Sequence, residues 1–284
     1  MEDILGDVLR ARRQDLDLRR VTNIDPYALL FLALLIRQRE EEDVPLTVRW
    51  PESNEVRRWM QAMRFFDDAG IRPRTASGSP TVKETAQPVT RIKDEAGIGR
   101  VVDRFEALLR AAYPLSEGSR RTLTAVMIEL FQNIPHHSNA TGDVADVHGI
   151  AAMADDHESL LLSIADKGIG FRRSLELREG LADLSDEAAL YQVMVVGKSR
   201  YIDPGRGGEL RRIANLARLW EGEFIVRSGT SMFVAHEEDE RFYDVSWFPG
   251  VQIALRLPRT LFDARPVDFS DVSAFNGKDE RTDV

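Results

Sequence analysis

The sequence contains no cysteine, no long hydrophobic run and no excess of positive charge. Without cysteine, the chain can form neither disulfides nor thiolate metal sites, which fits a reducing cytoplasm. Its longest apolar run, Tyr27–Ile36, is about half of the roughly 20 residues that cross a hydrocarbon core. The charges of both signs near the N-terminus do not predict a secretory signal, and the net charge of −9 argues against broad binding of nucleic acid or anionic lipid. We therefore expect a cytoplasmic protein with neither nucleic acid nor membrane as a partner.

The chain does contain enough apolar sequence for a sizeable core. Its 284 residues are 43% hydrophobic and 30% charged, and they can form two domains of ordinary size. The stretch Arg74–Pro88 is rich in Ser, Thr, Gly and Pro and is typical of a loop or linker. It divides the sequence into a first domain over residues 1–75, a linker over 76–95, a second domain over 96–261 and a polar tail over 262–284. We expect the tail to be poorly ordered.

The pattern of apolar residues predicts an α/β fold. The expected helices cover residues 27–43, 53–70, 99–115, a segment that begins near Ser119, and 206–223. The expected strands cover residues 45–50, 159–168, 224–229 and 251–258. Because helices precede a cluster of strands in the second domain, we expect a sheet with helices on one of its faces.

The helix expected from near Ser119 carries two stripes of residues. The apolar stripe has helical spacing and should be buried; it comprises Leu123, Val126, Met127, Leu130, Phe131 and Ile134. Glu129, Asn133 and His137 are four residues apart and form a second, polar stripe. Taken alone, this stripe is also what an exposed helix face contains. Pro135 should end or kink the helix around 131–135, which would place the polar stripe near a helix end.

A second candidate motif is the segment Ala165–Phe171, with the sequence ADKGIGF. It places the carboxylate of Asp166 at the end of an expected strand, beside Gly168 and Gly170, whose backbone has no side chain to block a ligand. An ordinary Asp-Gly turn between two elements would have the same sequence. The motif becomes informative only together with others.

A third candidate motif is the glycine-rich entry to the helix expected at 206–223. Gly205, Gly207 and Gly208 leave backbone N–H groups free at the positive end of the helix dipole, an arrangement that suits polyphosphate. Arg206 lies within the same loop. A helix entry that is glycine-rich for structural reasons alone is the other interpretation.

Together, in this order, the three segments resemble the GHKL ATP-binding fold of histidine kinases, anti-sigma serine kinases, type II topoisomerases, mismatch-repair ATPases and a chaperone family. ELFQN with HHS resembles its N box, DKGIGF its G1 box and GRGGEL its G2 box. LARLWEGEFIVRSG and PGVQIALRLP are similar to the closing helix and strands of the kinase-like branch. The resemblance covers about residues 96–260 and implies an α/β sandwich of the Bergerat type.

The resemblance implies ATP and Mg²⁺ as cofactors. Asn133 would coordinate Mg²⁺, Glu129 would act as general base, and Asp166 would accept the adenine amino group. The residues implied to bind the nucleotide are Asn133, His137, Asp166, Gly168, Gly170, Lys198, Arg200, Gly205, Arg206, Gly207 and Gly208. Residues 172–204 would form a mobile lid that excludes water.

The sequence departs from the family pattern in a few places. Pro135 is unusual within the N box, and Glu209 and Arg211 replace the small or apolar residues that often flank the third box. These departures leave nucleotide binding expected but argue against fast turnover.

The first domain resembles a STAS-like domain, the fold of anti-sigma antagonists, over residues 23–66. In phosphorylatable STAS domains a serine opens the helix after an aspartate, whereas here Asp25 is followed by Pro26 and Tyr27. That position cannot take a phosphate, so we do not expect self-regulation through it.

Several functions stay open at this point. The chain can be a regulatory Mg·ATP-dependent enzyme in signalling, either a slow ATPase or a serine protein kinase, with Glu129 as base. It can instead be a non-catalytic, nucleotide-gated switch that binds a protein partner in an anti-sigma-like way, or a degenerate interaction scaffold. A conventional histidine kinase is disfavoured, because no histidine precedes His136. We expect a protein partner and leave the oligomeric state open, a homodimer included.

Overall fold

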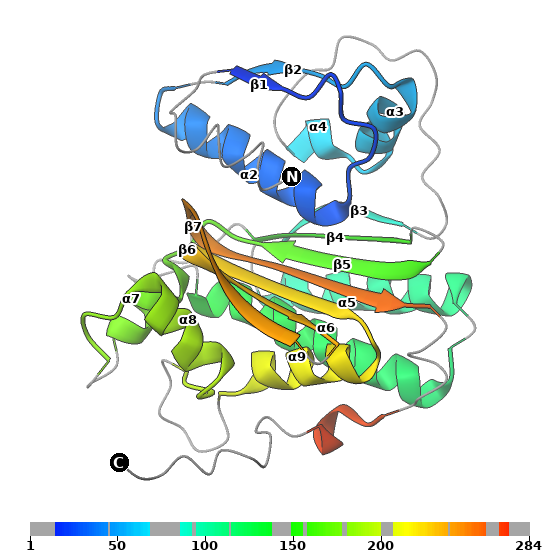
Figure 1. Ribbon diagram of the computed structural model, residues 1–284. Coiled ribbons are helices and arrows are strands. Elements are labelled where there is room, and N and C mark those ends of the chain that lie inside the picture. Colours follow the sequence, from blue (N-terminus) through cyan, green and yellow to red (C-terminus); the bar gives the residue numbers. More distant parts are fainter. Residues whose placement is uncertain are drawn as a thin grey trace.

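The computed structural model describes residues 15–44, 46–68, 86–92, 95–113, 115–137, 149–155, 158–177, 181–199, 207–237, 239–259 and 267–272. Over these residues the chain has a mixed α/β fold around a five-stranded antiparallel sheet with the strand order β3-β4-β5-β7-β6 (Figure 1). The strands are β3 (Gln87–Ile92), β4 (Gly149–Asp155), β5 (Ser159–Ala165), β6 (Glu223–His236) and β7 (Asp239–Pro258). Among the described helices, none has the length and apolar character that a membrane crossing requires.

Three helices cover one face of the sheet (Figure 1): α5 (Glu95–Ala112), α6 (Glu117–His137) and α9 (Glu209–Leu219). Successive residues of a strand point to opposite faces, and β4 shows the consequence. Ala151 and Met153 pack into the core beneath these helices, whereas Ile150 and Ala152 pack into a second core on the other face. All seven residues of β5 are buried, because both of its faces are covered.

The second face is covered by α2 (Pro26–Glu41) (Figure 1). Asp25 caps this helix by accepting a hydrogen bond from the N–H of Ala28 (2.8 Å), and Pro26 occupies its first turn. The residues from Ala28 to Ile36 are all buried. The helices of the expected second domain, α5, α6 and α9, lie on one face as predicted, and the other face is covered by a helix from the segment expected as the first domain. A helix that is apolar all round must be buried on all sides, and the sheet supplies one of its partners.

A small layer of short elements covers α2 on the side away from the sheet (Figure 1). Its described elements are the parallel strands β1 (Asp15–Asp17) and β2 (Thr47–Arg49) and the helices α3 (Asn54–Ala62) and α4 (Phe65–Asp68). Ser53 caps α3 through its hydroxyl. The single helix expected over 53–70 is divided in two, because Arg64 adopts a positive φ of 56°.

Pro135 does not end α6, which continues to His137. A proline lacks one N–H, and in the last turn of a helix this removes a single backbone hydrogen bond, so the helix can run a short way beyond it. The apolar stripe is confirmed for Leu123, Val126, Met127, Leu130 and Phe131, which are all buried. The side chain of Ile134 lies outside the described part of the structure.

Three strands were not anticipated: β1, β3 and β4. β3 lies within the segment expected as a linker, and β4 lies in a stretch to which no element was assigned. The remaining helices are α7 (Gly170–Glu176) and α8 (Asp186–Met194), and the 3-10 helix η2 (Phe269–Asp271) lies within the expected polar tail. Phe269 is buried in the main core, and the Thr122 hydroxyl donates to the carbonyl of Val267.

Candidate functional site

The turn after β5 is fixed by the carboxyl group of Asp166. Its Oδ1 accepts hydrogen bonds from the N–H groups of Gly168 (2.7 Å) and Val251 (3.3 Å). The backbone of Asp166 is held as well, because its N–H donates to Val251 and its carbonyl accepts from the side chain of Gln252 (3.1 Å). The residue is 3% exposed. Burial raises the pKa of Asp166 from 3.8 to about 7, although the two N–H groups favour the ionised form.

Glycines pack closely around this turn. Gly170 has a φ of 69°, and a Cβ there would lie 2.9 Å from Ser228 Oγ and 3.3 Å from the carbonyl of Gly250. Gly250 has a φ of 74°, and a Cβ there would overlap the backbone and the carboxyl group of Asp166. The side chain of Ser228 also accepts a hydrogen bond from the N–H of Phe171 (3.0 Å). These glycines let protein backbone approach Asp166 closely, and the turn leads directly into α7.

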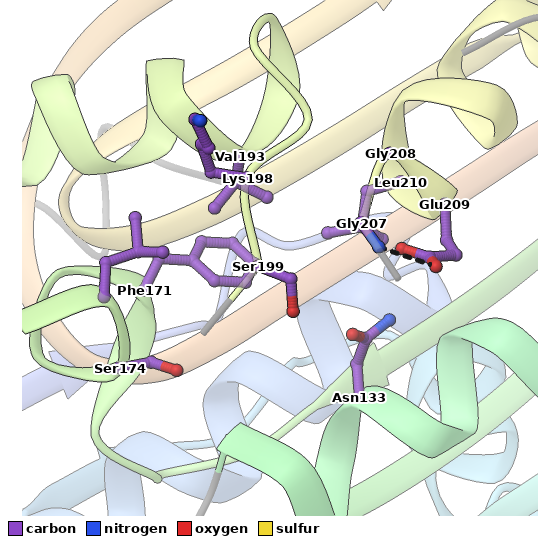
Figure 2. Close-up of a pocket in the computed structure, with 11 residues that line it drawn as sticks. Asn133, Phe171, Ser174, Val193, Lys198, Ser199, Gly207, Gly208, Glu209 and Leu210 are labelled. Carbon is purple, nitrogen blue, oxygen red and sulfur yellow. Dashed lines mark hydrogen bonds between the residues drawn. The ribbon is translucent and has the colours of Figure 1, made fainter. Parts of the chain in front are cut away.

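A cavity lies beside α7, where the ends of α6 and α8 meet the start of α9 (Figure 2). Its volume is about 30 Å³, enough for about two water molecules. It is lined by Asn133, Phe171, Ser174, Leu175, Val193, Lys198, Ser199, Gly207, Gly208, Glu209 and Leu210. Residues far apart in the sequence thus meet here, and among them are Asn133, Lys198, Gly207 and Gly208 from the predicted set. Within the described part of the chain, Glu129, Asp166, Gly168 and Gly170 are not among its lining residues.

The α6 side of the cavity is formed by Asn133. Its Nδ2 donates to the backbone carbonyl of Glu129 (2.9 Å), and its amide points toward the part of the cavity that Ser199 and Glu209 line (Figure 2). The Glu129 side chain is half-buried one turn earlier. Burial raises the pKa of Glu129, the negative charge of Glu209 raises it further, and Arg212 opposes both effects. The negative charge of Glu209 on α9 therefore affects the ionisation of Glu129 on α6 at this end of the site.

The opposite wall is the glycine entry to α9. Gly207 and Gly208 have φ angles of 108° and 87°, a conformation that favours glycine. A Cβ at Gly207 would overlap the carbonyl of Gly197, so the end of the α8 segment lies directly against this loop. The Oε1 of Glu209 accepts a hydrogen bond from the N–H of Gly207 (2.9 Å; dashed in Figure 2). Lys198 lines the same cavity but directs its ammonium group away from Asn133 (Figure 2).

Not every predicted residue can be placed. Arg200, Gly205 and Arg206 lie outside the described residues, and so does the side chain of His137. Two contacts were missed by sequence reasoning. Glu209 was noted only as a departure from a pattern, although an acidic residue in the first turn after two glycines is a helix-capping signal. Lys167 was not considered, and it forms an ion pair with Glu41 at the end of α2.

The oxygen atoms at this site suit a hard divalent cation. Amide and carboxylate oxygens, such as those of Asn133 and Glu129, are ligands that Mg²⁺ prefers. In the described ranges, no group of three or more His, Asp or Glu side chains is arranged to hold a metal ion. Mg²⁺ is commonly held by one or two protein oxygens together with phosphate and water, and such ligands are what these residues could offer.

No protein-family model and no curated protein matches the chain. One solved structure that is similar to it is the ATPase region of topoisomerase II from Saccharomyces cerevisiae, with 14% sequence identity and a TM-score of 0.25. The match covers 66% of this chain and 49% of that one, so this chain spans about half the length of the protein that it matches. A likeness at this level decides neither the fold family nor the activity of the chain.

Proposed function

We propose that the chain is a Mg·ATP-binding regulatory protein of the GHKL class. The observation that carries this proposal is the meeting of Asn133, Lys198 and the pair Gly207–Gly208 around one cavity, from segments widely separated in the sequence. A helix end with an amide, a cation and a glycine entry to a second helix together offer the groups that a Mg²⁺-bound polyphosphate needs. The Asp166 turn, which leads into the wall of the same cavity, supports recognition of an adenine amino group.

The proposed roles follow from the chemistry of each group. Asn133 would hold Mg²⁺, which when bound would neutralise charge on the phosphate oxygens. Glu129 would orient water or an acceptor hydroxyl and take up its proton. Its raised pKa suits this role, because a base whose pKa is closer to neutral pH accepts a proton more readily. The chain would then act as a slow ATPase or as a serine protein kinase.

The domain assignment is part of the same proposal. Residues 96–261 would form the ATP-binding domain, and residues 1–75 a STAS-like regulatory domain. The packing of α2 against β4 and β5 supports a link between the two domains. A conformational change in the first domain that moved α2 would alter its contacts with the sheet that carries Asp166. A protein partner would cause that change.

A nucleotide-gated switch is a second candidate, and the size of the cavity favours it. A volume of about 30 Å³ cannot contain a nucleotide, so binding would require the segments that line the cavity to move apart. A protein that changes its conformation on binding ATP can signal to a partner without any chemical step.

The test is to titrate the purified protein with ATP in Mg²⁺ by calorimetry, and then to follow ATP labelled on the γ-phosphate. Asn133→Ala should weaken Mg·ATP binding about tenfold or more, since it removes the metal-binding amide. Gln132→Ala, the exposed neighbour on α6, is the matched control and should change affinity by less than about twofold. Without saturable ATP binding by the wild-type protein or by the Glu209 variants described below, the proposed function is wrong.

The same labelled ATP separates enzyme from switch. Glu129→Gln should keep the affinity for ATP and lower the release or transfer of label about a hundredfold, as expected for loss of a general base. Glu117→Gln, an exposed glutamate at the start of α6, is its control. If the wild-type protein binds ATP and neither releases nor transfers the label, the switch is favoured.

A further inference from the structure

Glu209 lies where a phosphate group would be expected to bind. Its carboxylate accepts the N–H of Gly207 at 2.9 Å, at the entry to an 11-residue helix whose N-cap residue, Gly208, has no side chain that could cap it. An N–H group at this place is the donor that a glycine-led helix offers to an anion. In this structure the donor is already used by an anion of the protein itself.

The surroundings of Glu209 carry further negative charge. The Glu129 carboxylate is close enough for Glu209 to influence its ionisation, and Arg212 is the cation that opposes this effect. The other arginines of α9 that form ion pairs bond elsewhere: Arg211 and Arg218 both bind Glu240, each at 2.7 Å. A phosphate that entered while Glu209 stayed in place would therefore meet two carboxylates.

The loop leaves no room for both groups at once. The cavity beside Glu209 has a volume of about 30 Å³, and Gly207 lies against the carbonyl of Gly197. A phosphate group can reach the N–H of Gly207 only after the Glu209 side chain has turned away. This displacement would need changes only in the torsions of one side chain on the first turn of a helix.

We propose that Glu209 is an internal competitor of the nucleotide phosphates, which holds the site closed and lowers its affinity for ATP until it is displaced. This inference rests on the proposed function and adds its regulation: the site would exchange one anion for another. Bound Mg²⁺ would reduce the repulsion from Glu209, so the competition should be strongest for nucleotide without metal.

The test compares ATP binding by the full-length wild-type chain, Glu209→Gln and Glu209→Ala, each with Mg²⁺ and with a chelator. Both substitutions should tighten ATP binding, because they remove a partly buried negative charge beside the cavity. The effect should be about tenfold or more when a chelator removes Mg²⁺, and smaller when Mg²⁺ is present. Glu209→Gln keeps an oxygen that can accept the Gly207 N–H, whereas Glu209→Ala also frees that donor. The alanine variant should therefore bind at least as tightly as the glutamine variant.

The matched control is Glu187→Gln, which removes an exposed glutamate from the first turn of the neighbouring helix α8. It should change ATP affinity by less than about twofold in either condition. Pyrophosphate serves as a probe without a base, and its binding should follow the same order of variants. Thermal unfolding of each variant confirms that it is folded before binding is compared.

The outcomes distinguish the two proposals. Wild-type binding together with unchanged or weaker binding by both Glu209 variants would overturn the competitor role and leave the ATP site standing. Binding by the variants but not by the wild-type protein would support both proposals. If neither the wild-type protein nor the folded Glu209 variants bind ATP or pyrophosphate, both are overturned.

Discussion

The turn at Asp166 and the loop Gly207–Glu209 are the two halves of the candidate site, and the fold supports them differently. Asp166 follows β5 directly and exchanges hydrogen bonds with the backbone of β7. The tip of the Gly207 loop is held by a side chain, that of Glu209, which is bound within its own loop. The first half is therefore built into the sheet, and the second is closed by a local contact.

The Asp166 half also has support from the opposite face of the sheet. Phe31 on α2 packs against Phe248 with ring centroids 4.5 Å apart, and the guanidinium of Arg227 lies 4.7 Å from the centroid of the Phe31 ring. Gln252, whose side chain donates to the Asp166 carbonyl, pairs with Arg227 across the β6–β7 ladder. The two halves thus differ in how they would meet a ligand. Recognition of a base would use a preformed part of the core, whereas binding of phosphates would need a rearrangement of the loop at Gly207–Glu209.

The largest expected effect is the pH dependence of stability that Asp166 causes. Its pKa is raised to about 7 in the folded protein, so the native state keeps a proton that the unfolded chain releases. The stabilisation from this group is complete below about pH 4 and is lost as pH rises to about 7, with a slope of about 1.4 kcal/mol per pH unit. Asp166→Asn should remove this slope. The stability of the variant relative to wild type should therefore be higher at pH 8 than at pH 5.

Urea unfolding at several pH values measures this effect. Asp244→Asn, an exposed position on β7, is the control and should leave the wild-type pH dependence in place. If the free energy of unfolding changes with pH in the same way for wild type and Asp166→Asn, the carboxyl group is not buried as described. The Asp166 turn would then be no more firmly built into the core than the Gly207 loop.

A second, smaller effect concerns the glycine that lies against Asp166. Gly250→Ala should lower the free energy of unfolding by about 3 kcal/mol, because it adds a strained positive φ and a methyl group that overlaps the backbone of Asp166. Gly99→Ala on α5 is the matched control: a Cβ there meets nothing within 4 Å, and alanine should stabilise the helix by up to about 1 kcal/mol. Chemical denaturation measures both. Similar free energies of unfolding for the two variants would mean that the backbone around Asp166 can shift to accommodate the added methyl group.

The parts of the site that the sequence predicts are those with a local cause. The stripe that carries Asn133 follows from helical periodicity, the Asp166 turn follows from a strand that ends in Asp and Gly, and the start of α9 follows from its glycines. Each of these needs only neighbouring residues. The contact between Glu209 and Gly207 depends on a side-chain conformation, which composition and spacing do not specify.

The parts that could not be predicted depend on distant partners. β3 contains Pro88 and follows a polar stretch, and it becomes a strand because it pairs with β4 at the edge of the sheet, where proline is tolerated. β4 has the sequence GIAAMAD, in which only Ile150 has a strong intrinsic preference for a strand. The position of α2 on the second face likewise follows from burial and not from its own pattern, since a helix that is apolar all round does not indicate what covers it.

The smallest expected effect comes from the ion pair between Glu41 and Lys167, which joins the end of α2 to the Asp166 turn. The side chain of Glu41 is 63% exposed and that of Lys167 16%, so water screens one partner well. Glu41→Gln should lower the free energy of unfolding by less than about 1 kcal/mol. The exposed neighbour Glu40 provides the control, Glu40→Gln. The apolar contacts of Phe31 should then account for most of the link between α2 and the Asp166 half. A loss well above that of the control, measured by urea unfolding, would instead assign this link to the charged pair.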